Sequence, residues 1–256
     1  MEIESLFLFN SPLFFFTLLF FSIYFFAIFI IFKNWNSSSK YEASSCFISL
    51  FHGTPAVFLA LKSLLLLQQE EENFFKFSAK NTSFQDLVLE FSISYFIVDL
   101  THYIIFIPND ILFKAHHLVT LYVLFSCRFI IHHGAVSILV FLLLAEITSP
   151  CQNTWSLARY KSLDLPIANR YYEFLSPIFL SFYSFVRGIL GPFFAFKIGV
   201  FFINGGGNGF IPLWGLVSWS IVTVATIGIS ILWVFNQWVS LFRRRRAHNN
   251  VFKKVS

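Results

Sequence analysis

Residues 95–117 place Asp99, His102, His116 and His117 at or near membrane depth in a chain that is 57% hydrophobic. Ionisable groups in apolar membrane segments are costly, and they commonly mark functional sites. A histidine can take up a proton near neutral pH, and a carboxylate can hold its ring in one orientation. These residue types therefore predict proton transfer or the binding of a polar group, without naming a substrate.

The spacing within this stretch indicates how the groups face one another. Tyr95, Asp99 and His102 are separated by four and three residues, which places them on one stripe of a helix. Asp99 is expected to accept a ring N–H from a histidine and leave the other ring nitrogen free as a base. Because His116 and His117 are adjacent, they point about 100° apart on a helix. At most one of the pair can aim at a reacting atom, and the other orients it or contacts a neighbouring helix.

Further polar side chains lie on other apolar segments. At about 1.5 Å of rise per residue, they reach the same half of the bilayer as Asp99. Charged groups at the centre of a span cost about 2.5 to 3.5 kcal/mol each, so they are expected to face inward and to pair. We predict that they line a shared interior and bind substrate together with Tyr95 and His102; they are His52, Glu146, Tyr183 and Arg187.

The elements that must carry these groups are transmembrane helices. A mean hydropathy of +0.71, 38 Phe and 12% charged residues exclude a soluble domain and indicate an all-α integral membrane protein. About seven spans are expected, or six if the tight turn near His132 and His133 is continuous helix. They cover residues 6–32, 44–67, 87–107, 112–131, 133–150, 174–203 and 211–237.

Breaks and connections are also predicted. Pro150 is expected to end or bend the fifth span, and Gly188, Gly191 and Pro192 to loosen the sixth. The longest polar connection is expected at 151–173, and residues 205–209 form a glycine-rich turn without the lysine of a phosphate loop.

Orientation follows from the basic residues outside the spans. Twelve lie on the side of the C-terminus, against Lys76, Lys80 and Arg128 on the other side, so the C-terminus is expected in the cytosol and the N-terminus in the lumen. The final residues KKVS resemble a dilysine signal, which predicts location in the endoplasmic-reticulum membrane and a coat-protein receptor as partner. The twelve are Lys33, Lys40, Lys114, Arg159, Lys161, Arg170, Arg243, Arg244, Arg245, Arg246, Lys253 and Lys254.

Several classes of function are disfavoured. A short basic tail beside a membrane span is more typical of orientation or lipid contact than of nucleic-acid binding. The histidines come as two HH pairs at opposite membrane faces, without the HxxxH and HxxHH boxes of di-iron enzymes, so no metal is expected. The three cysteines have no CxxC spacing, and no GxSxG elbow predicts a serine hydrolase.

Four short motifs in order along the chain resemble the TLC-domain family, which includes the ceramide synthases. They are SISYFIVDL at 92–100, FKAHHLVT at 113–120, AEITSP at 145–150 and FVRGILGP at 185–192. The resemblance implies a helical bundle around a lipid-sized central cavity. It divides the chain into a first helix and loop at 1–39, a TLC domain at 40–240 and a basic tail at 241–256.

The family resemblance also implies a chemistry. In ceramide synthases a His-His pair serves acyl transfer from acyl-CoA to a long-chain base, and His116 and His117 carry that pair here. The later acidic pair is represented only by Glu146, a departure from the pattern that bears on ceramide synthesis itself. No cofactor is expected beyond acyl-CoA as a co-substrate.

Two functions are consistent with these residues. In the first, the protein acts in lipid homeostasis by acyl transfer to a lipid amine or hydroxyl: His117 takes the proton or the acyl group, Asp99 orients a histidine, and Arg187 binds a headgroup or stabilises an oxyanion. In the second, the same interior binds membrane lipid without catalysis, and the protein regulates membrane composition or escorts cargo from the endoplasmic reticulum.

Overall fold

The structure, a computed structural model, describes residues 11–70 and 77–255, with side chains described at all of these except 38, 67–70 and 247–255. The described residues form helices and no β-strand; one isolated bridge pairs Lys80 with His133. The elements are α2 (Pro12–Phe26), η1 (Ala27–Ile31), α3 (Ser37–Glu70), α4 (Ser83–Phe106), α5 (Ile111–Phe125), η2 (Ser126–Ile131), α6 (Ala135–Glu146), α7 (Ser149–Lys161), α8 (Pro166–Phe185), η3 (Val186–Leu190), α9 (Gly191–Ile203) and α10 (Leu213–Val255), where η denotes a π-helical turn.

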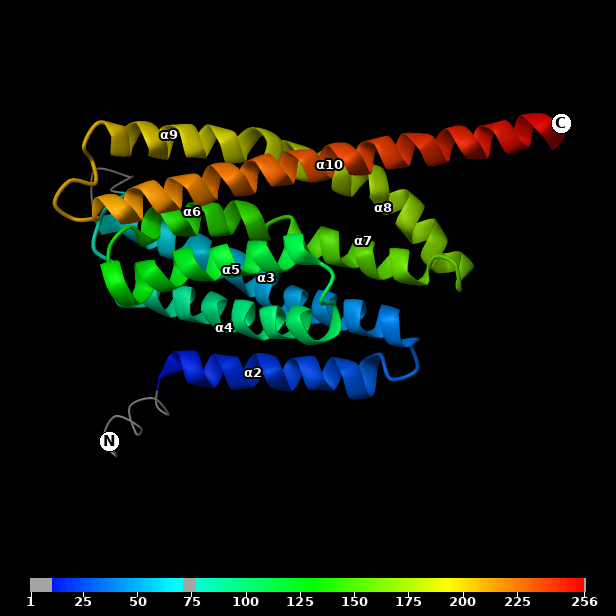
Figure 1. Ribbon diagram of the computed structural model, residues 1–256, viewed down its shortest axis with the longest axis horizontal. Helices are drawn as coiled ribbons and strands as arrows, with labels where there is room; N and C mark the ends of the chain where they lie inside the picture. Colours follow the sequence, from blue (N-terminus) through cyan, green and yellow to red (C-terminus); the bar gives the residue numbers. More distant parts are fainter. Residues whose placement is uncertain (1–10, 71–76, 256) are drawn as a thin grey trace.

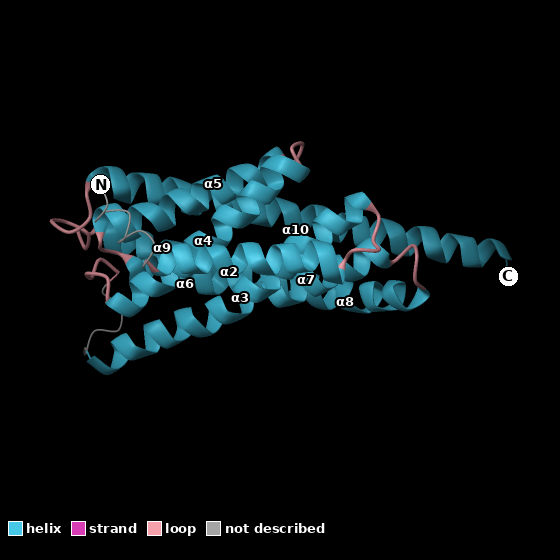
Figure 2. Ribbon diagram, turned by 90° about the horizontal axis from the view of Figure 1, so that it is seen from below, coloured by secondary structure: helices cyan, strands magenta, loops and turns pink. Residues whose placement is uncertain are grey.

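The helices run side by side as one bundle with α4 near its centre (Figures 1 and 2). In the most apolar stretch of α4, 72% of the residues are buried, against 22% in α2 and 17% in α10. α4 packs against α2, α3 and α5, while α10 lies along α8, α9 and α5. A helix buried on all sides can hold polar groups away from lipid on any face, so α4 is the natural carrier of a site.

The predicted all-α membrane bundle is confirmed. Six helical segments of the described chain are long and apolar enough to cross a membrane: 12–31, 39–66, 83–106, 135–161, 166–203 and 213–246. A seventh helix, formed by the fifteen residues of α5 and the six of η2, lies alongside them (Figure 1). The first predicted span began at Leu6; the described helix begins at Pro12, after the Ser11 side chain accepts the amide of Phe14, and residues 1–10 lie outside the described part.

The tight turn expected near His132 separates η2 from α6. His132 has φ 59° and Gly134 has φ 89°, a left-handed conformation that ends one helix and lets the chain reverse. The backbone of this turn also bonds the segment before α4, because Asn81 N donates to His132 O and Gly134 N donates to Ala79 O. The fourth and fifth predicted spans are therefore separate helices.

The fifth span breaks after Glu146, close to the predicted position, and Pro150 occupies the first turn of the next helix, α7. The predicted polar connection at 151–173 is wrong in form, because nearly all of it is helical. α7 continues to Lys161, and α8 begins at Pro166. The physical reason is that Trp155 on α7 packs on Tyr172 and Phe179 of α8, so the two helices bury an apolar seam beyond the expected ends of the spans.

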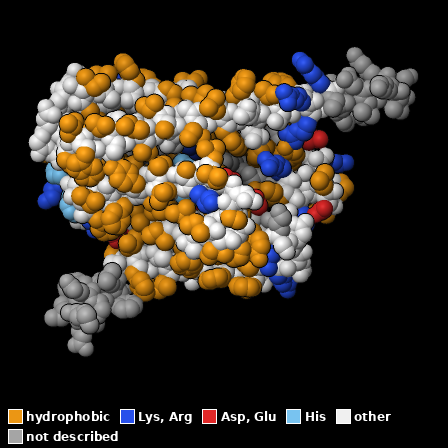
Figure 3. All heavy atoms as spheres, viewed as in Figure 1, with side chains coloured by type: hydrophobic (Ala, Val, Ile, Leu, Met, Phe, Trp, Pro, Cys, Tyr) orange, Lys and Arg blue, Asp and Glu red, His pale blue; other side chains and the backbone are white. Residues whose placement is uncertain are grey.

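The visible outer face is dominated by hydrophobic side chains, with Arg and Lys concentrated toward the end where α10 projects (Figure 3). Phe15, Phe29, Phe58 and Phe196 are among the exposed large apolar residues, as expected for lipid-facing helices. The beginning of α2 and the C-terminal end of α10 lie at opposite ends of the bundle (Figure 1). Lys76 and the side chains of the KKVS tail are outside the described part, so the predicted retrieval signal stays a prediction.

Candidate functional site

Asp99 is the centre of a polar cluster contributed by three helices. Its Oδ2 lies 2.8 Å from His117 Nε2 and accepts from the Tyr95 hydroxyl at 3.2 Å. Its Oδ1 accepts from the Ser45 hydroxyl at 2.8 Å. The carboxyl is 1% exposed, so these contacts from α3, α4 and α5 replace water almost completely. The predicted stripe on α4 thus meets partners from both neighbouring helices.

His117 has both ring nitrogens engaged. Nδ1 lies 2.9 Å from the Phe113 carbonyl oxygen, which can only accept, so this nitrogen carries a hydrogen. Nε2 shares a proton with Asp99, and the ring is 2% exposed. In this arrangement neither nitrogen of His117 is free to receive a proton from a substrate. The pair is instead a fixed joint between α4 and α5.

His52 extends the cluster toward α6. Its ring stacks on Tyr95 with centroids 4.1 Å apart and planes 4° from parallel, and its Nε2 lies 3.1 Å from the Ser92 hydroxyl. The other nitrogen, Nδ1, has no hydrogen-bond partner in the described chain and lies 3.9 Å from Glu146 Oε2. This separation is longer than a hydrogen bond, so a buried donor or acceptor and a buried carboxyl face each other across a gap.

His102 is hydrogen-bonded by a residue that the sequence analysis did not assign to the site. The Tyr24 hydroxyl on α2 lies 2.5 Å from His102 Nδ1, and both side chains are buried. Nε2 of His102 has no hydrogen-bond partner among the described residues. α2 therefore covers this face of the cluster and fixes one nitrogen of the ring, while the other nitrogen remains available.

Arg187 reaches the cluster from η3. It donates through Nη2 to the Ala145 carbonyl at 2.7 Å, and its guanidinium carbon lies 5.1 Å from the centroid of the Tyr183 ring. Its buried Nε has no partner in the described chain. The irregular helix predicted around Gly188 is this π-helical turn, a feature that often occurs at functional sites.

His116 points away from Asp99, as expected for a neighbour of His117. Its ring stands nearly perpendicular to His117, at 88° with centroids 5.7 Å apart. It is partly buried, and its ring nitrogens form no hydrogen bond with the described residues. His116 is the member of the pair with nitrogens available for a substrate.

The fold thus gathers the predicted site residues into two adjoining groups. The first group is centred on the Asp99 carboxyl and also contains His117, His102, Tyr95 and His52. The second group contains the remaining predicted residues and meets the first where His52 Nδ1 lies 3.9 Å from Glu146 Oε2. These remaining residues are Glu146, Tyr183, Arg187 and His116. Side chains pack directly on one another around Asp99, and the predicted central cavity stays a prediction.

Ser45, Ser92 and Tyr24 contact the site and were missed from the sequence. Serine and tyrosine are common in apolar helices, and their spacing carries no periodic signal that singles them out. Only the site residues they bond, Asp99, His52 and His102, which lie 40 to 78 residues away, give them a role. His, Cys, Asp and Glu side chains in the described ranges form no group of three suited to a metal ion.

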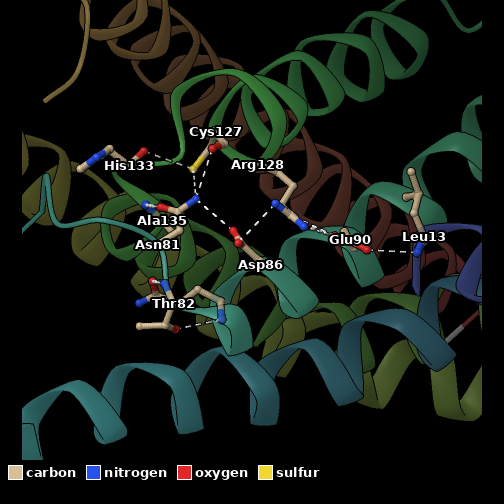
Figure 4. Close-up of polar contacts among 10 residues, drawn as sticks. Leu13, Asn81, Thr82, Asp86, Glu90, Cys127, Arg128, His133 and Ala135 are labelled. Carbon is tan, nitrogen blue, oxygen red and sulfur yellow. Dashed lines mark hydrogen bonds and ion pairs between the residues drawn. The ribbon is translucent and has the colours of Figure 1, made fainter. Parts of the chain in front are cut away.

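A second polar network, missed entirely, lies at the other end of α4 (Figure 4). Arg128 was counted as a loop charge; it lies in η2, and its Nε and Nη2 bond Glu90 Oε1 at 2.7 and 2.6 Å. Nη1 lies 3.3 Å from Asp86 Oδ2. Glu90 Oε2 accepts the amide of Leu13 at the start of α2.

Asn81 extends this network to the turn before α6. Its amide nitrogen donates to Asp86 Oδ1 at 3.2 Å and to the Cys127 carbonyl at 3.2 Å, and its oxygen accepts the amide of Ala135 at 3.1 Å. The network therefore joins the ends of α2, α4, η2 and α6 by direct bonds (Figure 4).

Fold and site together define a polytopic α-helical membrane protein with ionisable groups buried in its bundle. The TLC-domain family model matches residues 42–239, and the chain belongs to that family. It is 47% identical over 230 residues to a TLC domain-containing protein of Arabidopsis thaliana, an alignment that covers 89% of each chain. α2, which supplies Tyr24, lies outside residues 42–239, the part of the chain that the family model matches.

Proposed function

We propose that the protein acts in lipid homeostasis in the endoplasmic-reticulum membrane, by transferring an acyl group to a lipid amine or hydroxyl. The observation that carries the proposal is a set of three buried nitrogens that accompany the bonded Asp99–His117 pair and have no hydrogen-bond partner among the described residues: His52 Nδ1, His102 Nε2 and Arg187 Nε. A buried unpaired polar group costs about 1 to 3 kcal/mol. A bound polar headgroup or acyl carbonyl would supply the missing partners.

The reaction would proceed as acyl transfer from a thioester such as acyl-CoA. The lipid nitrogen or oxygen attacks the carbonyl carbon, a C–N or C–O bond forms, and the C–S bond breaks. The proton lost by the nucleophile passes to a histidine and then to the departing thiolate. A cation near the carbonyl oxygen stabilises the negative charge that develops there.

The geometry favours particular residues for these steps. His116 is the proposed base, because its ring nitrogens form no hydrogen bond with the described residues, and Arg187 is the proposed cation near the developing charge. His117, favoured by the sequence reasoning, is bonded at both nitrogens and is proposed with Asp99 as a positioning pair. His52, His102, Tyr95, Glu146 and Tyr183 are proposed to line the place of the substrate.

The location is part of the proposal. It is supported by the excess of basic residues on one side and by the KKVS tail. With the C-terminus cytosolic, the Asp99 cluster would lie in the cytosolic half of the bundle, since Asp99 is seven residues, roughly 10 Å, from the end of α4 at Phe106. Cytosolic acyl-CoA and a coat-protein receptor would both reach the proper side.

A second candidate is lipid binding without catalysis, in which the protein senses membrane composition or escorts cargo. The full engagement of His117 and its 2% exposure favour it, because a fixed joint between helices needs no proton transfer. The three unpaired nitrogens would serve this candidate equally well as binding groups.

The test is incubation of the purified protein with labelled acyl-CoA and a mixture of lipid acceptors. Under the catalytic proposal a labelled lipid forms, and His116→Ala lowers its rate by about 100-fold or more. His132→Asn, an exposed change at the other end of the bundle, is the control and leaves the rate unchanged. Turnover untouched by His116→Ala and by His117→Ala removes the catalytic roles.

The two candidates are separated in cells that lack the protein. If neither acceptor nor acyl donor is consumed in vitro, yet His116→Ala and His117→Ala fold and restore the lipid composition of these cells, the non-catalytic candidate holds. If both variants fold and fail to restore it while wild type succeeds, the histidines are required for function.

A further inference from the structure

Two arginines from different helices lie on one pair of neighbouring aromatic rings, away from the Asp99 cluster. The guanidinium carbon of Arg159 on α7 lies 5.5 Å from the Trp155 ring centroid, and that of Arg244 on α10 lies 4.8 Å from the Tyr172 ring centroid. Arg244 also bonds the Tyr172 hydroxyl. The two rings are 5.5 Å apart with their planes tilted by 39°, so each cation lies over one ring of a contacting pair, which we call the platform.

The platform is rigid. Trp155 is 2% exposed and donates its indole N–H to the Ser176 hydroxyl at 2.9 Å, while Ser176 donates to the Tyr172 carbonyl at 2.5 Å. Phe179 packs against the other side of Trp155. Both arginines are nevertheless exposed, so fixed rings present two solvent-accessible guanidinium groups.

The positive charge of these two arginines is not neutralised within the described chain. Neither Arg159 nor Arg244 forms an ion pair with a described carboxylate. The acidic residues of this end have other partners: Asp164 pairs with Lys161, Glu42 accepts from Tyr160, and Glu173 accepts from Asn169. Glu42 and Glu173 keep their negative charge, because Tyr160 and Asn169 are neutral donors, but neither carboxylate forms an ion pair with Arg159 or Arg244 in the described chain.

We propose that Arg159 and Arg244 form a binding site for the phosphate group of an anionic membrane lipid. The planar fork of arginine matches phosphate oxygens in a bidentate manner, and stacking on aromatic rings reduces the freedom lost on binding. Arg244 lies in the C-terminal part of α10, which projects at the end where Arg and Lys gather (Figure 3). Basic residues beside a membrane span attract anionic headgroups.

Exposed apolar side chains between Arg159 and Tyr172 in the chain favour a lipid over a soluble phosphate. The α7–α8 turn exposes Leu163, which is 99% accessible, and Leu165, and the beginning of α8 exposes Ile167 and Tyr171. An anionic lipid can place its phosphate at the arginines and its glycerol and upper acyl chains along these side chains. This site does not depend on acyl transfer at the Asp99 cluster.

The experiment measures binding of short-chain lipids to the full-length protein in neutral detergent. The probes are dioctanoyl phosphatidate, dioctanoyl glycerol without phosphate, and adenosine 3′,5′-bisphosphate as a soluble phosphate. The variant Arg159→Lys with Arg244→Lys keeps the charge and loses the fork; Arg245→Lys with Arg246→Lys is the matched control without an aromatic platform. Thermal unfolding without ligand checks that all variants are folded.

We expect phosphatidate to bind more tightly than the other two probes. The platform variant weakens phosphatidate binding by about tenfold, and the control variant leaves it within about twofold. Equal losses in the two variants would show diffuse attraction to a basic tail and overturn the site. If dioctanoyl glycerol binds as tightly as phosphatidate, the phosphate is not what the site recognises. If the bisphosphate binds more tightly than phosphatidate, the ligand of the site is a soluble phosphate and not a lipid.

Discussion

The two polar regions at the ends of α4 contain similar residues but differ in how their polar atoms are hydrogen-bonded. At one end, Arg128 bonds Glu90 with two nitrogens and approaches Asp86 with the third, and Glu90 uses its remaining oxygen on a backbone amide. At the other end, the Asp99–His117 pair is complete, yet His52, His102 and Arg187 each keep a buried nitrogen without a partner in the described chain.

This difference indicates a structural role for the Arg128 network and a binding role for the groups around Asp99. Buried polar groups in native proteins are nearly always bonded, so each exception asks for an explanation such as a ligand. The charged groups of the Arg128 network bond one another and several helix ends, which fits a role in holding the bundle together; next to Asp86, Gln85 Nε2 is also buried without a hydrogen-bond partner among the described residues. The groups around Asp99 need additional partners, which fits a role in binding.

Removing Arg128 should have the largest effect on stability. Arg128→Met leaves Glu90, whose side chain is 5% exposed, as an unpaired buried carboxyl, and we expect a loss of about 3 to 5 kcal/mol. The midpoint of thermal unfolding in detergent measures it. Arg128→Met combined with Glu90→Met removes both charges and should recover at least half of the loss. If Arg128→Met alone unfolds at the wild-type temperature, this network does not have the structural role assigned to it.

Filling the space beside Glu146 should have an intermediate effect. A Cβ at Gly53 would lie 2.6 Å from Glu146 Oε2 and 2.9 Å from Ser149 Cβ, so Gly53→Ala pushes α3 and α6 apart. We expect a loss of about 1 to 3 kcal/mol from overpacking. Gly228→Ala, also within a helix but with nothing within 4 Å of its Cβ, is the control and should be neutral or slightly stabilising. Equal behaviour of the two variants in thermal unfolding would argue against the close approach at Gly53.

The smallest effect on stability should come from Arg187→Met, although the same substitution is the most damaging at Arg128. It removes an unpaired Nε, and the Ala145 carbonyl keeps its bond from Thr148 at 3.1 Å. We expect thermal stability within about 1 kcal/mol of wild type, because deleting an unsatisfied buried group costs little. Lipid binding or turnover should fall instead. A loss of stability comparable to that of Arg128→Met would show that Arg187 also has a structural role, and would contradict the difference between the two polar regions.

Much of the architecture was predictable from local composition. Runs of apolar residues long enough to cross a bilayer predicted the bundle, the tight turn before α6 was expected near His132 and His133, and Pro150 marked the break after Glu146. The stripe of Tyr95, Asp99 and His102 correctly indicated one face of α4. These features depend on helical periodicity and on the conformational limits of Gly and Pro, which act within a few residues.

The polar partners were not predictable in the same way. Glu90 and Arg128 are 38 residues apart, and Tyr24 and His102 are 78 residues apart, so no local spacing relates them. The helical hairpin α7–α8 was also taken for a polar connection, because its apolar seam only becomes continuous when the two helices pack.

The sequence by itself determined that this chain crosses a membrane as helices and carries more ionisable groups than lipid would tolerate, because hydropathy and helical period are local properties. Only the tertiary structure decided which of those groups are bonded to one another and which remain open to a ligand. The physical reason is that a hydrogen bond depends on two atoms meeting within about 3 Å, and helix packing alone brings distant residues that close.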